Sequence, residues 1–155
     1  MNRNDEFMDD VIKVGENDTV EFKSWVKTSG RNARVRLAVD ELIAFANAKG
    51  GTVYFGIEDS GQVTGCSDYD CQSLIEAIYD KTRPPLFTNI EEIQYQGHIV
   101  LALSVVHDGN TYATTDGRCL KRLGKNSKPY YPEEMSNHYT CLLYTSDAAD
   151  ELDGV

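Results

Sequence analysis

Cysteine is scarce in this sequence, and its pattern excludes a disulfide scaffold. The chain has 155 residues and four cysteines, Cys66, Cys71, Cys119 and Cys141. Their spacings contain no paired C-x-x-C motif. Their number is far below that of small secreted domains that depend on disulfides. We therefore expect reduced thiols in a cytoplasmic protein.

Long apolar runs and targeting segments are also missing. No stretch approaches the about 20 apolar residues that a transmembrane helix needs. The N-terminus, MNRNDEFMDD, is too acidic and polar for a signal peptide. We therefore expect no membrane partner. The apolar fraction of 41% and the charged fraction of 26% are ordinary for one globular domain.

Phosphate-binding motifs of the common nucleotide folds are absent as well. The stretch GGTVYFGIEDSG (residues 50–61) lacks the Gly-Lys-Ser/Thr ending of a P-loop, and LGKNS (residues 123–127) lacks its first glycine. Neither stretch has the G-x-G-x-x-G fingerprint. We therefore expect no nucleotide cofactor.

Positive charge is in the minority. The chain has 15 Lys and Arg against 25 Asp and Glu, a formal net charge of −10, which counts against a polyanion as partner. Back-translated, residues 141–150 can encode a transposase sequencing adaptor, so we expect 141–155 to be a non-native tail and the native protein to continue into further C-terminal domains. Without the four acidic residues of that tail the net charge is −6. Binding of a polyanion would then need a local basic patch or bound metal ions.

The first half of the chain predicts a strand, a helix and a second strand. Residues 1–14 are expected to form a polar leader. Val20, Phe22 and Trp25 alternate with polar residues, which predicts a half-buried strand. Apolar residues recur at helical spacing over 33–49, which predicts an amphipathic helix.

Glycine and proline divide the rest of the chain. Gly50-Gly51 is expected to end the first helix, and a strand over 52–58 is followed by a tight turn at 59–61. A second helix, capped by Ser67 or Asp68, must end before Pro84-Pro85. Later strands are predicted over 89–96, 98–106, 111–115 and 119–124. This order predicts a compact single α+β domain that has a mixed β-sheet and two main helices.

Three carboxylates could converge on one edge of this sheet. Glu21 lies on the polar face of the first predicted strand, Glu16 precedes that strand, and Asp59 follows the second. Three clustered carboxylates repel each other unless a hard cation such as Mg²⁺ or Mn²⁺ joins them. Such a metal can orient a phosphodiester and activate a water. The alternative is that Glu21 faces solvent and Asp59 only forms the turn.

Basic residues gather in two places. One cluster surrounds the start of the first helix, and the other occupies the late strands; together they are Lys27, Arg31, Arg34, Arg36, Arg118, Lys121, Arg122, Lys125 and Lys128. The second cluster could follow a nucleic-acid backbone. The alternative is a solvated edge strand on which lysine prevents aggregation.

Four segments together resemble the Schlafen AlbA-like domain family. They are GENDTVEFKSW, ELIAFANAKGGTVYFGIEDSGQVTG, RPPLF and CLKRLGKNSKPYYPEEM, and the resemblance runs from Gly15 to Met135. We therefore assign residues 15–140 to such a domain. The Glu-Phe-Lys element and the Ala-Phe-Ala-Asn-x-x-Gly-Gly element are specific when they occur in this order.

The resemblance implies two activities. Bacterial members resemble nucleic-acid-binding modules, whereas the Schlafen branch contains divalent-metal-dependent RNA endonucleases that use three carboxylates. On this chain those carboxylates fall on Glu16, Glu21 and Asp59. Lys23 matches a phosphate-holding lysine, and Arg122 matches the basic residue of a late R-x-G element. The Schlafen enzyme has two related lobes, so a binding groove here implies a homodimer or a missing second half.

We predict first a DNA- or RNA-binding module, the N-terminal part of a bacterial transcriptional regulator or defence protein. Its predicted nucleic-acid contacts are Lys23, Arg34, Arg118, Lys121, Arg122 and Lys125. The alternative is a metal-dependent endoribonuclease in which Glu16, Glu21 and Asp59 hold Mg²⁺ or Mn²⁺. A second alternative, favoured by the net negative charge, is an oligomerisation or sensor domain without a nucleic-acid role.

Overall fold

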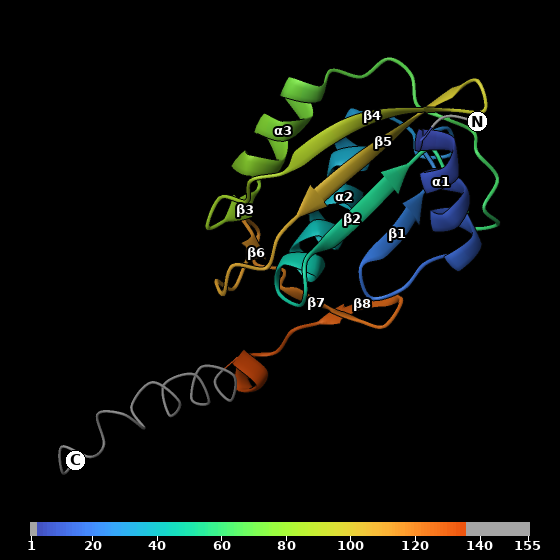
Figure 1. Cartoon of the computed structure of the whole chain (residues 1–155). Helices are drawn as coiled ribbons and strands as arrows, with labels where there is room; N and C mark the ends of the chain where they lie inside the picture. Colours follow the sequence, from blue (N-terminus) through green and yellow to red (C-terminus); the bar gives the residue numbers. More distant parts are fainter. Residues whose placement is uncertain (1–2, 136–155) are drawn as a thin grey trace, which may run out of the picture.

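The computed structural model describes residues 3–135, which fold around a four-stranded sheet (Figure 1). The predicted non-native tail, 141–155, lies outside the described residues. No helix within 3–135 combines the length and the apolar character needed to cross a membrane. In chain order the elements are α1 (Arg3–Val14), β1 (Val20–Lys23), α2 (Arg31–Ala46), β2 (Gly51–Phe55), α3 (Cys71–Asp80), β3 (Thr82–Arg83), β4 (Asn89–Tyr95), β5 (His98–Val105), β6 (Ala113–Thr114), β7 (Leu120–Leu123) and β8 (Asn126–Pro129).

The sheet is mixed, as the sequence predicts. Its strand order is β1-β2-β5-β4. Strands β1 and β2 are parallel and joined through α2, whereas β2–β5 and β5–β4 are antiparallel. Strands β3 and β6 form one separate ladder, and β7 and β8 form another. The predicted α+β class is therefore confirmed.

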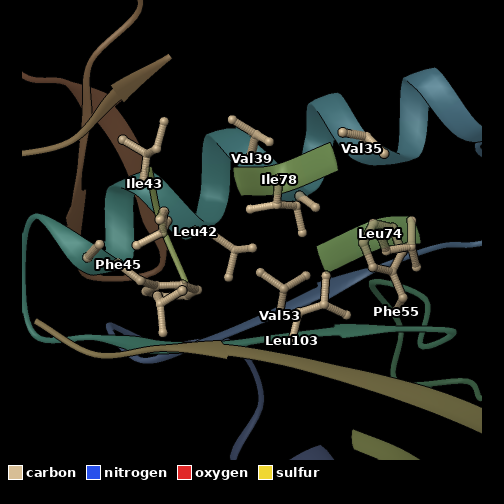
Figure 2. Packing of buried hydrophobic residues seen from close by; sticks show 14 of the residues in the cluster. Val35, Val39, Leu42, Ile43, Phe45, Val53, Phe55, Leu74, Ile78 and Leu103 are labelled. Carbon is tan, nitrogen blue, oxygen red and sulfur yellow. The ribbon is translucent and has the colours of Figure 1, made fainter. Parts of the chain in front are cut away.

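Helices α2 and α3 cover one face of this sheet. The apolar stripe predicted for α2 is buried along its whole length and comprises Val35, Ala38, Val39, Leu42, Ile43 and Ala46. Figure 2 shows Leu42 of α2 and Ile78 of α3 above Val53 and Leu103 of the sheet, in the cluster to which all four belong. The helical period of apolar residues thus forms α2, and burial against β2 and β5 holds it in place.

The opposite face is covered by α1, which corrects the prediction of a polar leader. Met8 of α1 is fully buried in a second cluster with Phe22 and Tyr54. Trp25 belongs instead to the cluster under α2. The prediction that Phe22 and Trp25 share a face is therefore wrong, because β1 ends at Lys23 and the chain turns between them.

The structure corrects the predicted cap of α3 and confirms the predicted turn between β4 and β5. The cap of α3 is Asp70, whose carboxylate accepts the Ser73 N–H, and neither Ser67 nor Asp68 caps this helix. The turn between β4 and β5 is at Gln96-Gly97 as predicted, with φ of 51° and 75° at these residues. A pair of positive φ values suits a tight hairpin between antiparallel strands.

Helix α2 and strand β2 meet closely at Gly50-Gly51. Helix α2 ends at Ala46, earlier than predicted, and the Gly50 N–H donates to the Phe45 carbonyl at 2.7 Å. A side chain on Gly51 would lie 2.6 Å from the Phe45 ring. Glycine is therefore required at position 51 to let strand β2 pass the buried phenylalanine.

Candidate functional site

Glu21 of β1 is buried and paired with Arg122 of β7. Glu21 is 7% exposed, and its Oε1 accepts a hydrogen bond from Arg122 Nη1 at 2.8 Å. The side chain of Arg122 is fully buried. The two residues are far apart in sequence, so their contact fixes the β7–β8 hairpin against the central sheet.

Arg122 satisfies its remaining donors mostly on backbone carbonyls. Its Nη2 donates to Asn17 at 3.0 Å and to Val20 at 3.1 Å, and its Nε donates to Gly124 at 3.1 Å. Its guanidinium also lies over the Phe45 ring, 4.8 Å from the centroid. A buried cation with these partners is a structural anchor.

A second buried carboxylate, Glu41 of α2, joins this group. It is 8% exposed and accepts a hydrogen bond from Ser127, and Lys23 lies 3.2 Å from it. Arg122 Nη1 is 3.5 Å from Glu41. We call Glu21, Lys23, Glu41 and Arg122 the ion cluster. Glu41 was missed from the sequence, although a charged residue within the apolar stretch of a helix is a usable signal.

The ion cluster is balanced in charge, with two carboxylates and two cations. Burial lowers the pKa of the Arg122 guanidinium, and the nearby carboxylates of Glu41, Glu16 and Asp18 oppose this effect. A guanidinium keeps its proton at any physiological pH. The positive charge of Arg122 is therefore permanent in this cluster.

The structure brings together two of the three carboxylates predicted to bind a metal. Oε2 of Glu16 and Oε2 of Glu21 both accept the Phe22 N–H at 3.1 Å. Asp59 is exposed in the turn after β2, where it lines an open hollow with Lys23, Lys27 and Ser60. Nowhere in residues 3–135 do three His, Cys, Asp or Glu side chains form a group able to hold a metal ion.

This arrangement does not fit the three-carboxylate metal site expected from the sequence. The prediction assumed that Glu21 faces solvent or a bound cation, whereas the buried guanidinium of Arg122 supplies the positive charge beside it. The same contact rules out the alternative of a solvated strand position for Glu21. Arg122 is correspondingly enclosed, which corrects its assignment as a nucleic-acid contact.

Manganese is therefore expected to leave the stability of this chain unchanged. Because Glu21 is already paired, we expect millimolar Mn²⁺ to shift the melting temperature by less than about 1 °C relative to EDTA. Thermal unfolding followed by circular dichroism measures this shift. A rise of several degrees that is lost in Glu21→Gln would contradict the structure and restore the metal site.

Glu58, a buried carboxylate, follows β2 and directly precedes Asp59, the predicted metal ligand. Glu58 is 5% exposed, accepts a hydrogen bond from Thr64 at 2.6 Å and pairs with Lys27 at 3.0 Å. Burial alone would raise the pKa of Glu58, but hydrogen bonds from Thr64, Ser24 and Lys27 lower it overall. Glu58 thus contributes stability at neutral pH that is lost as the pH falls below its ordinary value of 4.5.

Two more predicted nucleic-acid contacts are occupied within the fold. Arg34 lies 4.0 Å above the Trp25 ring and donates to the Trp25 carbonyl at 2.9 Å. Arg118 forms an ion pair with Asp40. With Lys23 in the ion cluster, these residues are held by protein partners, which reduces the charge they offer to a ligand.

The β7–β8 hairpin carries the remaining predicted cations. In its register Arg122 faces Ser127 and Lys121 faces Lys128. Because neighbouring residues of a strand point to opposite faces, the buried Arg122 and the half-buried Ser127 place the half-buried Lys121 and the exposed Lys128 on the outer face. Lys125 is exposed at the tip. We call Lys121, Lys125 and Lys128 the hairpin lysines.

Comparison with known proteins gives a family and a fold. A family model described as "Schlafen, AlbA_2" matches residues 16–131. The crystal structure of the DIP2311 protein from Corynebacterium diphtheriae is similar, with a TM-score of 0.62 and 25% identity. The match covers 73% of this chain and 22% of DIP2311, so the chain spans about a fifth of that protein.

A second solved structure has the same fold. It is the solution structure of the N-terminal domain of an ATP-dependent DNA helicase RecG-related protein from Nitrosomonas europaea. Its TM-score is 0.55 at 19% identity, and the match covers 84% of this chain and 95% of that domain. No curated protein matches the sequence.

Proposed function

The chain belongs to the Schlafen, AlbA_2 family, and from that premise we propose that it is a nucleic-acid-binding module whose contact surface is the outer face of the β7–β8 hairpin. A domain of similar fold belongs to a DNA helicase RecG-related protein, which supports nucleic acid as the partner. That the module acts within a larger cytoplasmic regulator or defence protein, and as a homodimer, stays a prediction.

The observation that carries this proposal is the pairing of Lys121 with Lys128. The two lysines are directly opposite each other on antiparallel strands. Like charges in this position destabilise a hairpin, and an anion between them would relieve the repulsion. No Asp or Glu occurs from residue 117 to 132 in a chain whose net charge is −10. The outer face is therefore a local exception to the acidic surface.

Exposed apolar and aromatic side chains lie beside these lysines. Leu123 is 69% exposed and Tyr131 is 55% exposed. Lys121 Nζ lies 5.0 Å from the centroid of the buried Tyr130 ring, a cation–π contact that orients the ammonium group. An exposed tyrosine close to the hairpin lysines is suited to stacking on an unpaired base. Single-stranded nucleic acid is therefore the preferred ligand.

The ion cluster supports binding without cleavage. Glu21 is paired with the permanent charge of Arg122, and within residues 3–135 Glu16, Glu21 and Asp59 do not form a group that could hold a metal ion. No step of phosphodiester hydrolysis is assigned to these residues. The hairpin lysines, in contrast, need no further group to attract a phosphate backbone.

Neutralising the hairpin is expected to weaken nucleic-acid binding and its dependence on salt. For Lys121→Gln/Lys128→Gln we expect the slope of log K against log salt concentration to fall by about two, one unit for each lost phosphate contact. Fluorescence anisotropy with labelled single-stranded RNA and duplex DNA at several salt concentrations measures this slope.

A matched control is the exposed Lys13 of α1, on the opposite face of the sheet. Lys13→Gln should keep the full slope. If the wild-type chain and the double variant bind the nucleic acid with equal affinity, the hairpin is not the contact surface. Absence of binding by the wild-type chain would favour a sensor or oligomerisation domain.

A further inference from the structure

A hollow of about 440 Å³ lies between the N-terminal half of α2 and the turn that follows β6. Three cations line it, Arg36 of α2, Lys81 after α3 and Arg118 before β7, against one carboxylate, Asp116. Its volume is within the range of about 300–1,000 Å³ that small-ligand sites occupy. In a chain with a net charge of −10, a concave surface that carries more cations than carboxylates is unusual.

Arg36 and Lys81 supply most of the available charge in this hollow. Both residues are exposed. Arg118 is partly offset by its ion pair with Asp40, which approaches it from α2. The first turn of α2 contributes Asn32 and Ala33 to the lining, and the partial positive charge at the start of that helix adds to the field of the side chains.

Asp116 occupies the place where a ligand oxygen would meet Arg118. Its Oδ1 is 3.4 Å from Arg118 Nε, and that Nε is buried without a hydrogen-bond partner among the described residues. The Asp116 carboxylate accepts a hydrogen bond from Thr114. The Thr114 hydroxyl, with Arg118 and Arg36, lowers the pKa of Asp116. The hollow thus already stabilises one oxyanion.

We propose that this hollow binds a phosphate group. Planar guanidinium groups and a lysine ammonium are the side chains that recognise phosphate oxygens, and Thr115 lines the same hollow. The phosphate is carried either by a free mononucleotide or by the strand bound at the hairpin lysines. The second form rests on the proposed function, because Arg118 precedes Lys121 by only three residues.

Heteronuclear NMR titration of the full chain tests this proposal, with inorganic phosphate, 5′-AMP and a single-stranded RNA 12-mer as probes. Saturable shifts are expected at the amides of Asn32, Ala33 and Thr115. Arg36→Gln or Lys81→Gln should weaken binding about tenfold, since each removes one charged hydrogen bond. Asp116→Asn should strengthen it about fivefold, since the competing carboxylate is lost.

The higher phosphate affinity expected for Asp116→Asn is the more decisive result, because a variant that had lost its structure would not bind more tightly. Arg83→Gln, at an exposed arginine of β3 outside the hollow, is the matched control and should bind like the wild-type chain. Circular dichroism of each variant checks its fold.

The probes separate the two sources of phosphate. Binding of 5′-AMP that Arg36→Gln weakens supports a mononucleotide site. RNA binding that Arg36→Gln weakens, without binding of 5′-AMP or inorganic phosphate, supports a backbone contact. No effect of Arg36→Gln, Lys81→Gln and Asp116→Asn on any probe would overturn the proposal. If Lys121→Gln/Lys128→Gln loses RNA binding while the three variants of the hollow keep it, the hairpin is the contact surface and the hollow is not a phosphate site.

Discussion

Replacing Arg122 with methionine is expected to lower the free energy of unfolding by about 3–5 kcal/mol, because it leaves the buried Glu21 without its cation and Glu41 with Lys23 alone. Glu21 and Glu41 are 7% and 8% exposed, so water cannot take the place of the guanidinium. The Asn17 carbonyl would lose its guanidinium donor as well, and the Val20 carbonyl would keep the Asn17 N–H alone of these two donors. Lys23 is paired with Glu41, so Glu21 is the carboxylate that loses its charge partner.

Urea unfolding at pH 7 followed by circular dichroism measures this loss. Arg83→Met, at an exposed arginine, is the matched control and should change stability by less than about 0.5 kcal/mol. Replacing Glu21, Glu41 and Arg122 together with methionine should recover much of the stability, because apolar groups of similar size can replace a buried ion group. An Arg122→Met chain as stable as wild type would show that the cluster is open to solvent.

Truncating Phe45 to alanine is expected to cost a similar amount, about 3–5 kcal/mol, because a buried aromatic ring leaves a cavity when it is removed. Phe45 is fully buried at the end of α2. It contacts the guanidinium of Arg122 on one side and approaches Gly51 on another. The ring therefore connects the apolar core to the ion cluster, and its loss weakens both.

Thermal unfolding measures this effect, with an expected fall in melting temperature of roughly 10–20 °C. Phe87→Ala is a matched control at a phenylalanine that is 78% exposed, and it should shift the melting temperature only slightly. A comparable fall in both variants would show that the core cluster is not arranged around Phe45 as described.

Elements with a strong period were predictable from the sequence. The apolar positions of α2 and the continuous apolar run of β5 are patterns that one stretch of chain displays by itself. Helix α1 was missed because its many acidic residues indicate a polar leader, although Met8, Val11 and Ile12 are spaced to lie on one helical face. Its burial depends on the sheet face that it covers, which no local pattern reveals.

The ion cluster was half predictable. Glu21, Lys23 and Arg122 were identified as chemically important, but their partners were not. A carboxylate near the sheet edge is compatible with a metal ion, with solvent or with an arginine, and only the tertiary approach of β7 decides among them. Glu41 needed the same information, since its partner Ser127 comes from a hairpin 86 positions later.

The anchoring of the hairpin by Arg122 also has a kinetic consequence. A loop that must order itself on its ligand associates slowly and loses conformational entropy at that step. This hairpin is already held by a buried side chain, so the backbone that carries the hairpin lysines is in place before the ligand arrives. Association should then be limited by diffusion and charge, with a rate constant at or above about 10⁵–10⁷ M⁻¹s⁻¹ that falls as salt is added. Dissociation, rather than encounter, would set how long a bound strand stays in place.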